Sequence, residues 1–234
     1  MKDNKNLDIF YKGDYQPINN ELLSEGMDIL QEVQAIQEKY NKEDTDTFIN
    51  ELRDSITGKT LGFNLINTEK HGFDCKWSQK RDLFLEVKSA SFSAQSWAAT
   101  FNDTNLDKAE AFKDRKLWLA LSVWKGASDL LFICYGQHEG VGEYLEHKIR
   151  TKRPESRSTQ TISLSKLVFK YDFKILTINK TKEELFNILR MKSSSFTKLD
   201  YQTHIVSLKE YVKQISTHNK KFMSIAESVQ YQRL

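Results

Sequence analysis

The chain contains little proline, glycine or cysteine: its 234 residues include 2 Pro, 9 Gly and 2 Cys. So few chain-breaking residues give no sign of a flexible linker, and the length is sufficient for one substantial core, so we expect a single domain. Cys75 and Cys134 stand alone, without the C-x-x-C spacing that zinc and redox sites use. Both are therefore predicted to be buried free thiols.

Signals for membranes, histidine-based metal sites and nucleotides are also missing. No apolar run approaches the roughly 18 residues needed to span a bilayer, and the first eight residues lack the apolar stretch of a signal peptide. The 5 His residues form no H-x-x-x-H pair, and no glycine-rich stretch is followed by the Lys-Ser/Thr of a phosphate loop. We therefore expect a soluble, cytoplasmic protein without a histidine metal site or a nucleotide-hydrolysing loop.

Charge is unevenly divided along the chain. Residues 1–56 carry 6 Lys and Arg against 13 Asp and Glu, a net charge of −7, whereas the whole chain carries +3. Residues 57–234 therefore carry +10, and this is the part to which an anionic polymer would bind. An ordinary solvated surface also tolerates such an excess, so charge alone does not establish nucleic-acid binding.

Helical patterns lie near both ends of the chain. Residues 20–40 place apolar side chains at helical spacing with acidic residues between them, which predicts an amphipathic helix. A second helix is predicted from about Thr45, in a run of capping residues, to a stop at Gly58. From Glu183 onward the pattern is again mostly helical, with Ile205 on its apolar face.

The middle of the chain has the pattern of β-strands. Residues 91–101 are predicted as an edge hairpin or an irregular loop, and residues 104–113 as a short helix capped by Thr104. Residues 148–160 combine dense positive charge with a proline, which predicts an exposed loop. The predicted strands are 61–68, 73–78, 82–88, 116–124 and 130–135, the last two nearly continuous in apolar residues, as central strands are.

These elements predict an α/β fold with a central mixed β-sheet flanked by helices and with helical N- and C-terminal extensions. Within one domain over 1–234, we expect acidic helices in 1–58, a catalytic sheet core in 59–180 and further helices in 181–234. No internal repeat or low-complexity tract interrupts this order.

Three charged residues in the first strands are placed to converge. In the strand 82–88, the period of two puts Glu86 and Lys88 on one face and the apolar residues on the other. The preceding strand holds Asp74, and the polar residues 79–81 between the strands suit a hairpin turn. Asp74 is therefore expected across from Glu86, with the charged pair held outward by a buried apolar face.

Asp74, Glu86 and Lys88 resemble the signature of the PD-(D/E)xK nuclease superfamily, in which Asp-x(n)-Glu-x-Lys lies on two neighbouring strands of a mixed sheet. Phe73 stands where the superfamily name has proline. The resemblance implies a restriction-endonuclease-like architecture over about residues 45–135, and most familiar members are type II restriction endonucleases.

By this resemblance, Asp74 and Glu86 bind Mg²⁺ together with the Val87 carbonyl, since carboxylate and carbonyl oxygens suit this ion. Lys88 orients or activates the attacking water, and the nearby acids favour its charged form and hence an electrostatic role. Superfamily members often recruit an acidic residue from the preceding helix, which makes Glu51 a further candidate metal ligand. The alternative is that these carboxylates lie on an exposed surface, Asp74 and Glu86 paired with lysines.

Two groups of polar residues are candidates for contact with DNA. Polar side chains that follow the motif strand are placed to touch phosphates or bases, and arginine in the basic loop can clamp phosphate or read guanine. Solvated surface side chains are the alternative for both groups. The candidates are Ser89, Ser91, Ser93 and Gln95 in the first group and Arg150, Lys152, Arg153 and Arg157 in the second.

The chain is therefore expected to be a Mg²⁺-dependent type II restriction endonuclease that hydrolyses phosphodiester bonds of double-stranded DNA at a short specific sequence. Cutting both strands is simplest for a twofold homodimer, and a cognate DNA methyltransferase is expected in the same system. Three alternatives stay open: another PD-(D/E)xK nuclease acting in repair, at transposon ends or in defence; a noncatalytic DNA-binding protein with this fold; and an interaction domain with an accidental motif.

Overall fold

The computed structural model divides the chain into two compact units, Met1–Phe48 and Ile49–Leu234. In the first unit, the described residues between Ile29 and Lys39 are helical, in agreement with the helix predicted over 20–40. The candidate site lies in the second unit. The described residues are 29, 32–33, 35–36, 39, 48–65, 74–77, 83–126, 128–152 and 158–218.

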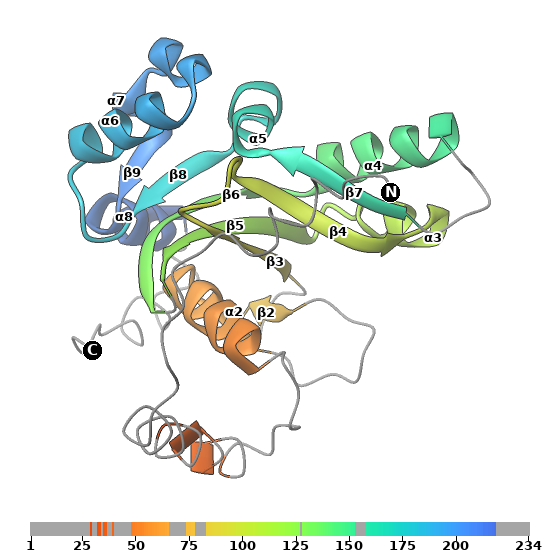
Figure 1. The fold of residues 1–234 in the computed structure, drawn as a ribbon, viewed down its shortest axis with the longest axis horizontal. Helices are drawn as coiled ribbons and strands as arrows, with labels where there is room; N and C mark the ends of the chain where they lie inside the picture. The colour runs from red at the N-terminus through yellow and green to blue at the C-terminus, as the bar shows by residue number, and fades with distance from the viewer. Residues whose placement is uncertain are drawn as a thin grey trace, which may run out of the picture. The chain divides into compact units, whose positions relative to one another are not determined.

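A mixed β-sheet organises the second unit (Figure 1). In spatial order, its described strands are β1 (Phe63–Leu65), β2 (Cys75–Trp77), β3 (Phe84–Ser91), β5 (Leu117–Lys125), β6 (Asp129–Gln137), β8 (Lys174–Thr177) and β9 (Ile205–Ser207). β3 is parallel to β5 and β8 to β9, whereas the other neighbours are antiparallel. Each of the five predicted strands is therefore present, and the mixed character of the sheet is confirmed.

Helices and a second, two-stranded sheet cover the main sheet. β4 (Ala98–Thr104) pairs antiparallel with β7 (Ser158–Ser163). Figure 1 shows α2 on one side of the main sheet and α4, α5, β4 and β7 on the other. None of the helices in the described residues is both long and apolar enough to cross a membrane. From residue 48 onward, the described helices are α2 (Phe48–Thr60), α3 (Leu106–Ala111), α4 (Glu139–Lys152), α5 (Leu164–Tyr171), α6 (Lys182–Lys192), η2 (Ser194–Lys198, a 3-10 helix), α7 (Tyr201–His204) and α8 (Leu208–His218).

The central strands β5 and β6 are buried on both faces, as their apolar continuity predicts. Alternate side chains of β5 enter two separate hydrophobic clusters, with Leu119 and Leu121 in one and Ala120 and Trp124 in the other. Burying a side chain as large as leucine stabilises the fold by about 1.5 to 3 kcal/mol, so these strands supply much of the hydrophobic stabilisation.

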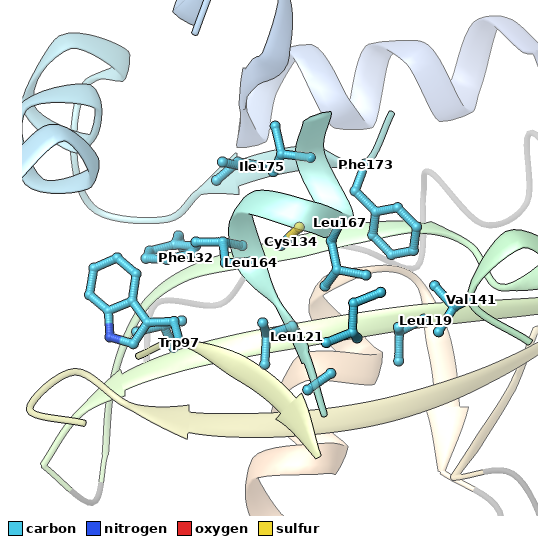
Figure 2. Packing of buried hydrophobic residues seen from close by; sticks show 14 of the residues in the cluster. Trp97, Leu119, Leu121, Phe132, Cys134, Val141, Leu164, Leu167, Phe173 and Ile175 are labelled. Atoms are coloured by element: carbon cyan, nitrogen blue, oxygen red, sulfur yellow. The ribbon is translucent and has the colours of Figure 1, made fainter. Parts of the chain in front are cut away.

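The larger cluster fills the space between the sheet and the helices that cover it (Figure 2). Leu164 and Leu167 of α5 lie over strand residues that include Leu121 and Cys134. Cys134 is buried in this cluster and Cys75 in the other, and neither forms a disulfide. The prediction of two buried free thiols is confirmed.

Helix α2 ends two residues later than predicted because Gly58 packs against the sheet and does not stop the helix. A Cβ at Gly58 would lie 2.5 Å from the Cys75 Sγ, so the missing side chain allows α2 to approach β2 closely. The stop comes at Gly62, whose φ of 85° lies in the left-handed region and whose N–H bonds the Lys59 carbonyl.

The prediction of an exposed loop over 148–160 is wrong at both ends of this segment, since residues 158–160 belong to β7 and residues 153–157 lie outside the described part. Residues 148–152 form the end of α4. Val141, Leu145 and Ile149 recur every four residues and are buried, which anchors the helix on the core. The dense charge around them occupies the solvent side of the helix.

Two further elements differ from the sequence pattern. Thr104 is the last residue of β4 and pairs with Ser158, so Asn105 caps α3 instead, accepting a hydrogen bond of 2.8 Å from the Lys108 N–H. Ile205 begins β9 and pairs with Ile175 of β8. The apolar spacing around Ile205 fits a helix face as well as a buried strand, and only the neighbouring strand decides between them.

Candidate active site

The hairpin formed by β2 and β3 brings Asp74 and Glu86 together. Cys75 is paired with Leu85 in antiparallel register, and the same register one residue further places Asp74 opposite Glu86. The Asp74 side chain continues the ladder, because its Oδ2 accepts a hydrogen bond of 2.6 Å from the Val87 N–H. The expected turn residues 79–81 lie outside the described residues.

Lys88 completes the group on the same face of β3. Its Nζ lies 2.6 Å from the Glu86 Oε1 and donates a hydrogen bond of 3.1 Å to the Val87 carbonyl. The ammonium also lies 5.6 Å from the centre of the Phe101 ring of β4. Three contacts thus hold the lysine beside the two carboxylates.

The charged pair is covered, not held outward as the strand pattern predicts. Glu86 is only 5% exposed, and the Lys88 side chain is 23% exposed. The cover comes from the layer that contains β4, whose Phe101 lies over Lys88. β4 follows β3 in the chain, but its partner strand β7 is distant in sequence, so local alternation does not reveal this layer.

Burial and the neighbouring charges shift the pKa values of Asp74 and Lys88. Burial, and then the negative charge of Glu86, raises the pKa of Asp74 to about 6, although Lys88 and the Val87 N–H act in the opposite direction. Burial tends to lower the pKa of Lys88, but the carboxylates of Glu86 and Asp74 more than offset this and raise it. Lys88 therefore stays protonated at neutral pH, which fits an electrostatic role.

The oxygen atoms of this group suit a divalent cation. Among the described residues, Asp74 Oδ1 and Glu86 Oε2 accept no hydrogen bond, so each carboxylate has one oxygen available. A cation between them would relieve the repulsion that raises the Asp74 pKa. No three His, Cys, Asp or Glu side chains gather as a metal cluster within the described part of the chain. The oxygens of the motif that could hold a cation are those of the two carboxylates and the Val87 carbonyl, which also accepts from Lys88.

Among the α2 side chains that the structure describes, Asp54 is an acid whose charge acts on the motif. Glu51 lies in α2, and its side chain lies outside the described part of the structure. Asp54, one turn further along, is half-buried, and its negative charge contributes to raising the pKa of Lys88. The signal for Asp54 is available in the sequence, because residues three apart share a helix face.

The Cys75 thiol, close to the motif, is unsuited to chemistry. Burial, and then the charges of Asp74 and Asp54, raises the pKa of Cys75 to about 12. Its Sγ lies 3.9 Å from the Asp54 carbonyl oxygen. The thiol therefore stays protonated and serves the packing of α2 against β2.

The polar residues that follow the motif strand do not lie with the carboxylates of the motif. Ser89 alternates with Lys88, and its Oγ lies 3.0 Å from the Ser122 Oγ on the opposite face of the sheet. Ser91 and Ser93, whose hydroxyls lie 2.9 Å apart, and Gln95 belong to an exposed segment at the end of β3. The structure therefore brings none of these side chains to the carboxylates.

Of the four basic candidates, Arg150 and Lys152 belong to the described residues, and both lie on α4. Arg150 donates a hydrogen bond of 2.9 Å from its Nε to Glu146 one turn earlier, so its charge is already partnered. Lys152 is the last residue of the helix, and its side chain lies outside the described residues, as do Arg153 and Arg157.

His138 packs against Phe101, the ring beside Lys88, and against Phe112. The sequence pattern did not single it out. It is fully buried, its ring lies 4.6 Å from Phe112 and 5.6 Å from Phe101, and neither ring nitrogen has a hydrogen-bond partner within the described residues. Burial, with a contribution from the positive charge of Lys88, lowers the pKa of His138 to about 3. The imidazole is therefore neutral in the folded protein at neutral pH.

His138 is expected to make the fold sensitive to acid. Its pKa is about 6.5 when unfolded and about 3 when folded, so the unfolded chain binds the proton more tightly. The part of the stability that depends on a neutral His138 is present above pH 6.5 and decreases by about 1.4 kcal/mol per pH unit below it. The His138→Phe variant should gain this amount relative to wild type for each unit between pH 6 and pH 4, measured by urea unfolding. The control is His147→Gln, which removes an exposed imidazole. A His138→Phe variant whose stability relative to wild type does not rise between pH 6 and pH 4 would contradict the burial.

A scan against protein-family models finds no match for this chain, and a search of curated proteins finds none. Inference about function therefore depends on the residues of the site themselves.

Proposed function

We propose that the protein is a Mg²⁺-dependent endonuclease of the PD-(D/E)xK superfamily, most specifically a type II restriction endonuclease acting on double-stranded DNA. The observation that carries this proposal is the convergence of three side chains on one face of a hairpin. Asp74 stands opposite Glu86, and Lys88 is bound to Glu86 at 2.6 Å.

The surrounding elements support the resemblance. α2 precedes the hairpin and packs on it through Gly58, and α3 leads into the apolar strands β5 and β6. β3 is parallel to β5, which makes the motif strand an interior strand of a mixed sheet. An interior strand holds its side chains rigidly, as a hydrolytic site requires.

Each residue of the group has a role in phosphodiester hydrolysis. Asp74, Glu86 and the Val87 carbonyl would hold Mg²⁺, which when bound stabilises the negative charge that develops on the phosphate. Lys88 places a permanent positive charge beside the carboxylates, where it can neutralise an attacking hydroxide or a phosphate oxygen. The layer that covers Glu86 limits the access of water, which strengthens these interactions.

The proposed partners follow from this chemistry. Duplex DNA is the substrate, a homodimer would cut both strands with one site per chain, and a DNA methyltransferase of the same system would protect the host sequence. The net charge of +10 over residues 57–234 is consistent with binding to a polyanion.

Incubation with phage DNA and Mg²⁺ tests the function. A restriction endonuclease gives discrete fragments, and EDTA prevents their formation. A smear would favour a repair, transposon-end or defence nuclease over sequence-specific restriction. DNA left intact under all conditions, although bound by the protein, would favour the noncatalytic DNA-binding alternative.

The raised pKa of Asp74 makes metal binding dependent on pH. A proton competes with the cation for this carboxylate, whose pKa is about 6, so affinity should be constant above pH 7. Below pH 6 it should fall about tenfold per pH unit. Calcium affinity measured by calorimetry between pH 5 and pH 8 checks this; a constant affinity across the range would contradict the assignment of Asp74 as a ligand.

A further inference from the structure

Lys108 of α3 is a second lysine near the site, and it has no carboxylate partner among the described residues. Its Nζ donates a hydrogen bond of 3.2 Å to the Asn102 carbonyl and lies 5.7 Å from the centre of the Phe112 ring. Lys113 and Lys182 also cross between elements, but they are bound to acids, Glu146 and Glu210. Lys192 donates to the backbone carbonyls of Phe92 and Ala94.

An aromatic pair connects Lys108 to the motif. Phe112 lies 5.5 Å from Phe101, and the Lys88 ammonium lies over the Phe101 ring at 5.6 Å from its centre. The two lysines are thus held over neighbouring rings of one layer. The positive charge of Lys108 also reaches the carboxylate group, since it contributes to lowering the pKa of Asp74.

Both ends of Lys108 are held in place. Its backbone N–H donates to the Asn105 side chain, which caps α3, and its ammonium returns to the Asn102 carbonyl. Between these two anchors, Asp103 adopts a φ of 49° and the β4–β7 register shifts, so the corner is a defined turn. The ammonium is therefore positioned before any ligand arrives, which lowers the entropy lost on binding.

We propose that Lys108 is a phosphate-binding residue that contacts a phosphodiester group of the DNA backbone next to the one held at Asp74 and Glu86. This inference rests on the proposed function. The carboxylates repel the DNA backbone until a metal ion neutralises them, and a nearby cation whose charge acts on Asp74 offsets part of that repulsion. Lys108 donates to one carbonyl, and an ammonium has three donors, so it has capacity for a phosphate oxygen.

The alternative role for Lys108 is to tie the corner between β4 and α3 without contact to DNA. The two roles differ in their dependence on salt. A lysine that neutralises a phosphate releases a condensed counterion, so its removal reduces the slope of log affinity against log salt by about 1. A residue that only ties a corner changes stability but leaves this slope unchanged.

The test measures binding of a labelled duplex oligonucleotide by fluorescence anisotropy in Ca²⁺ over a series of NaCl concentrations. Lys108→Met removes the charge but keeps an apolar stem over Phe112, and Lys108→Arg keeps the charge. Lys170→Met is the matched control, because Lys170 lies 5.2 Å from the Tyr171 ring on α5, which Figure 1 shows apart from α3.

We expect Lys108→Met to bind severalfold more weakly and to show a slope smaller by about 1, with wild-type slopes for Lys108→Arg and Lys170→Met. Lys108→Gln serves as a second neutral variant if urea unfolding shows that the methionine variant is not folded. A wild-type slope for the neutral variant would overturn the inference alone. Absence of any duplex binding by the wild-type protein would overturn the proposed function, and the inference with it.

Discussion

Replacing Lys88 with alanine is expected to reduce Mg²⁺-dependent cleavage of DNA by about 1,000-fold, equivalent to about 4 kcal/mol of transition-state stabilisation. The reason is that Lys88 is the cation in direct contact with Glu86, at 2.6 Å, and stays charged at neutral pH. Cleavage rates are measured at saturating Mg²⁺ and at pH 8, because loss of Lys88 also removes an influence that lowers the Asp74 pKa.

The loss of cleavage should not be a loss of binding. Duplex DNA affinity in Ca²⁺ should fall severalfold at most, far less than cleavage, because one phosphate contact is a small part of a whole interface. Lys76→Ala is the matched control: Lys76 is an exposed lysine on the neighbouring strand β2, 5.6 Å from the Phe84 ring. If the Lys88→Ala protein cleaves DNA at the same rate as the Lys76→Ala protein, the motif lysine has no part in the reaction.

Replacing Glu86 with glutamine is the second change with a large expected effect. Glutamine keeps the shape of the side chain but removes the negative charge, and with it several kcal/mol of the metal's contribution, so cleavage should fall by about 1,000-fold. Stability should change little, since losing the attraction to Lys88 is offset by relief of the repulsion with Asp74. Cleavage assays and urea unfolding on the same preparation measure both quantities.

This combination separates a catalytic carboxylate from a structural ion pair. Glu139→Gln is the control, because Glu139 forms an exposed ion pair of 3.1 Å with Arg115, and such pairs contribute about 0 to 1 kcal/mol. Its cleavage and its stability should both match wild type. A Glu86→Gln protein that is strongly destabilised but still cleaves DNA would mean that the pair with Lys88 holds the fold together and takes no part in hydrolysis.

Local sequence patterns predict much of the sheet and the relative positions of the motif residues. Alternation along β3 places Glu86 and Lys88 on one face, and the register of an adjacent hairpin follows from a short connection. Apolar continuity identifies β5 and β6 as central strands, because burial on both faces leaves no room for polar residues. Each of these inferences depends on neighbours in the chain.

The parts that sequence patterns miss depend on distant segments. The layer that covers Glu86 includes Phe101 of β4, which pairs with Gln160 of β7, far along the chain. Ile205 is a strand residue only because β8 lies beside it. Asp54 could have been found, since it shares a helix face with Glu51, but only the contact of α2 with β2 shows that its charge acts on Lys88.

The most direct test of the site is a calorimetric titration of the wild-type protein and of Asp74→Asn with Ca²⁺ at pH 7.5. If Asp74 and Glu86 hold a divalent cation between neighbouring strands, the wild-type protein takes up the ion and the variant, which keeps the side-chain shape but loses the charge, does not. Equal uptake by both proteins, or none by either, would contradict the central claim that these carboxylates form a metal-dependent hydrolytic site.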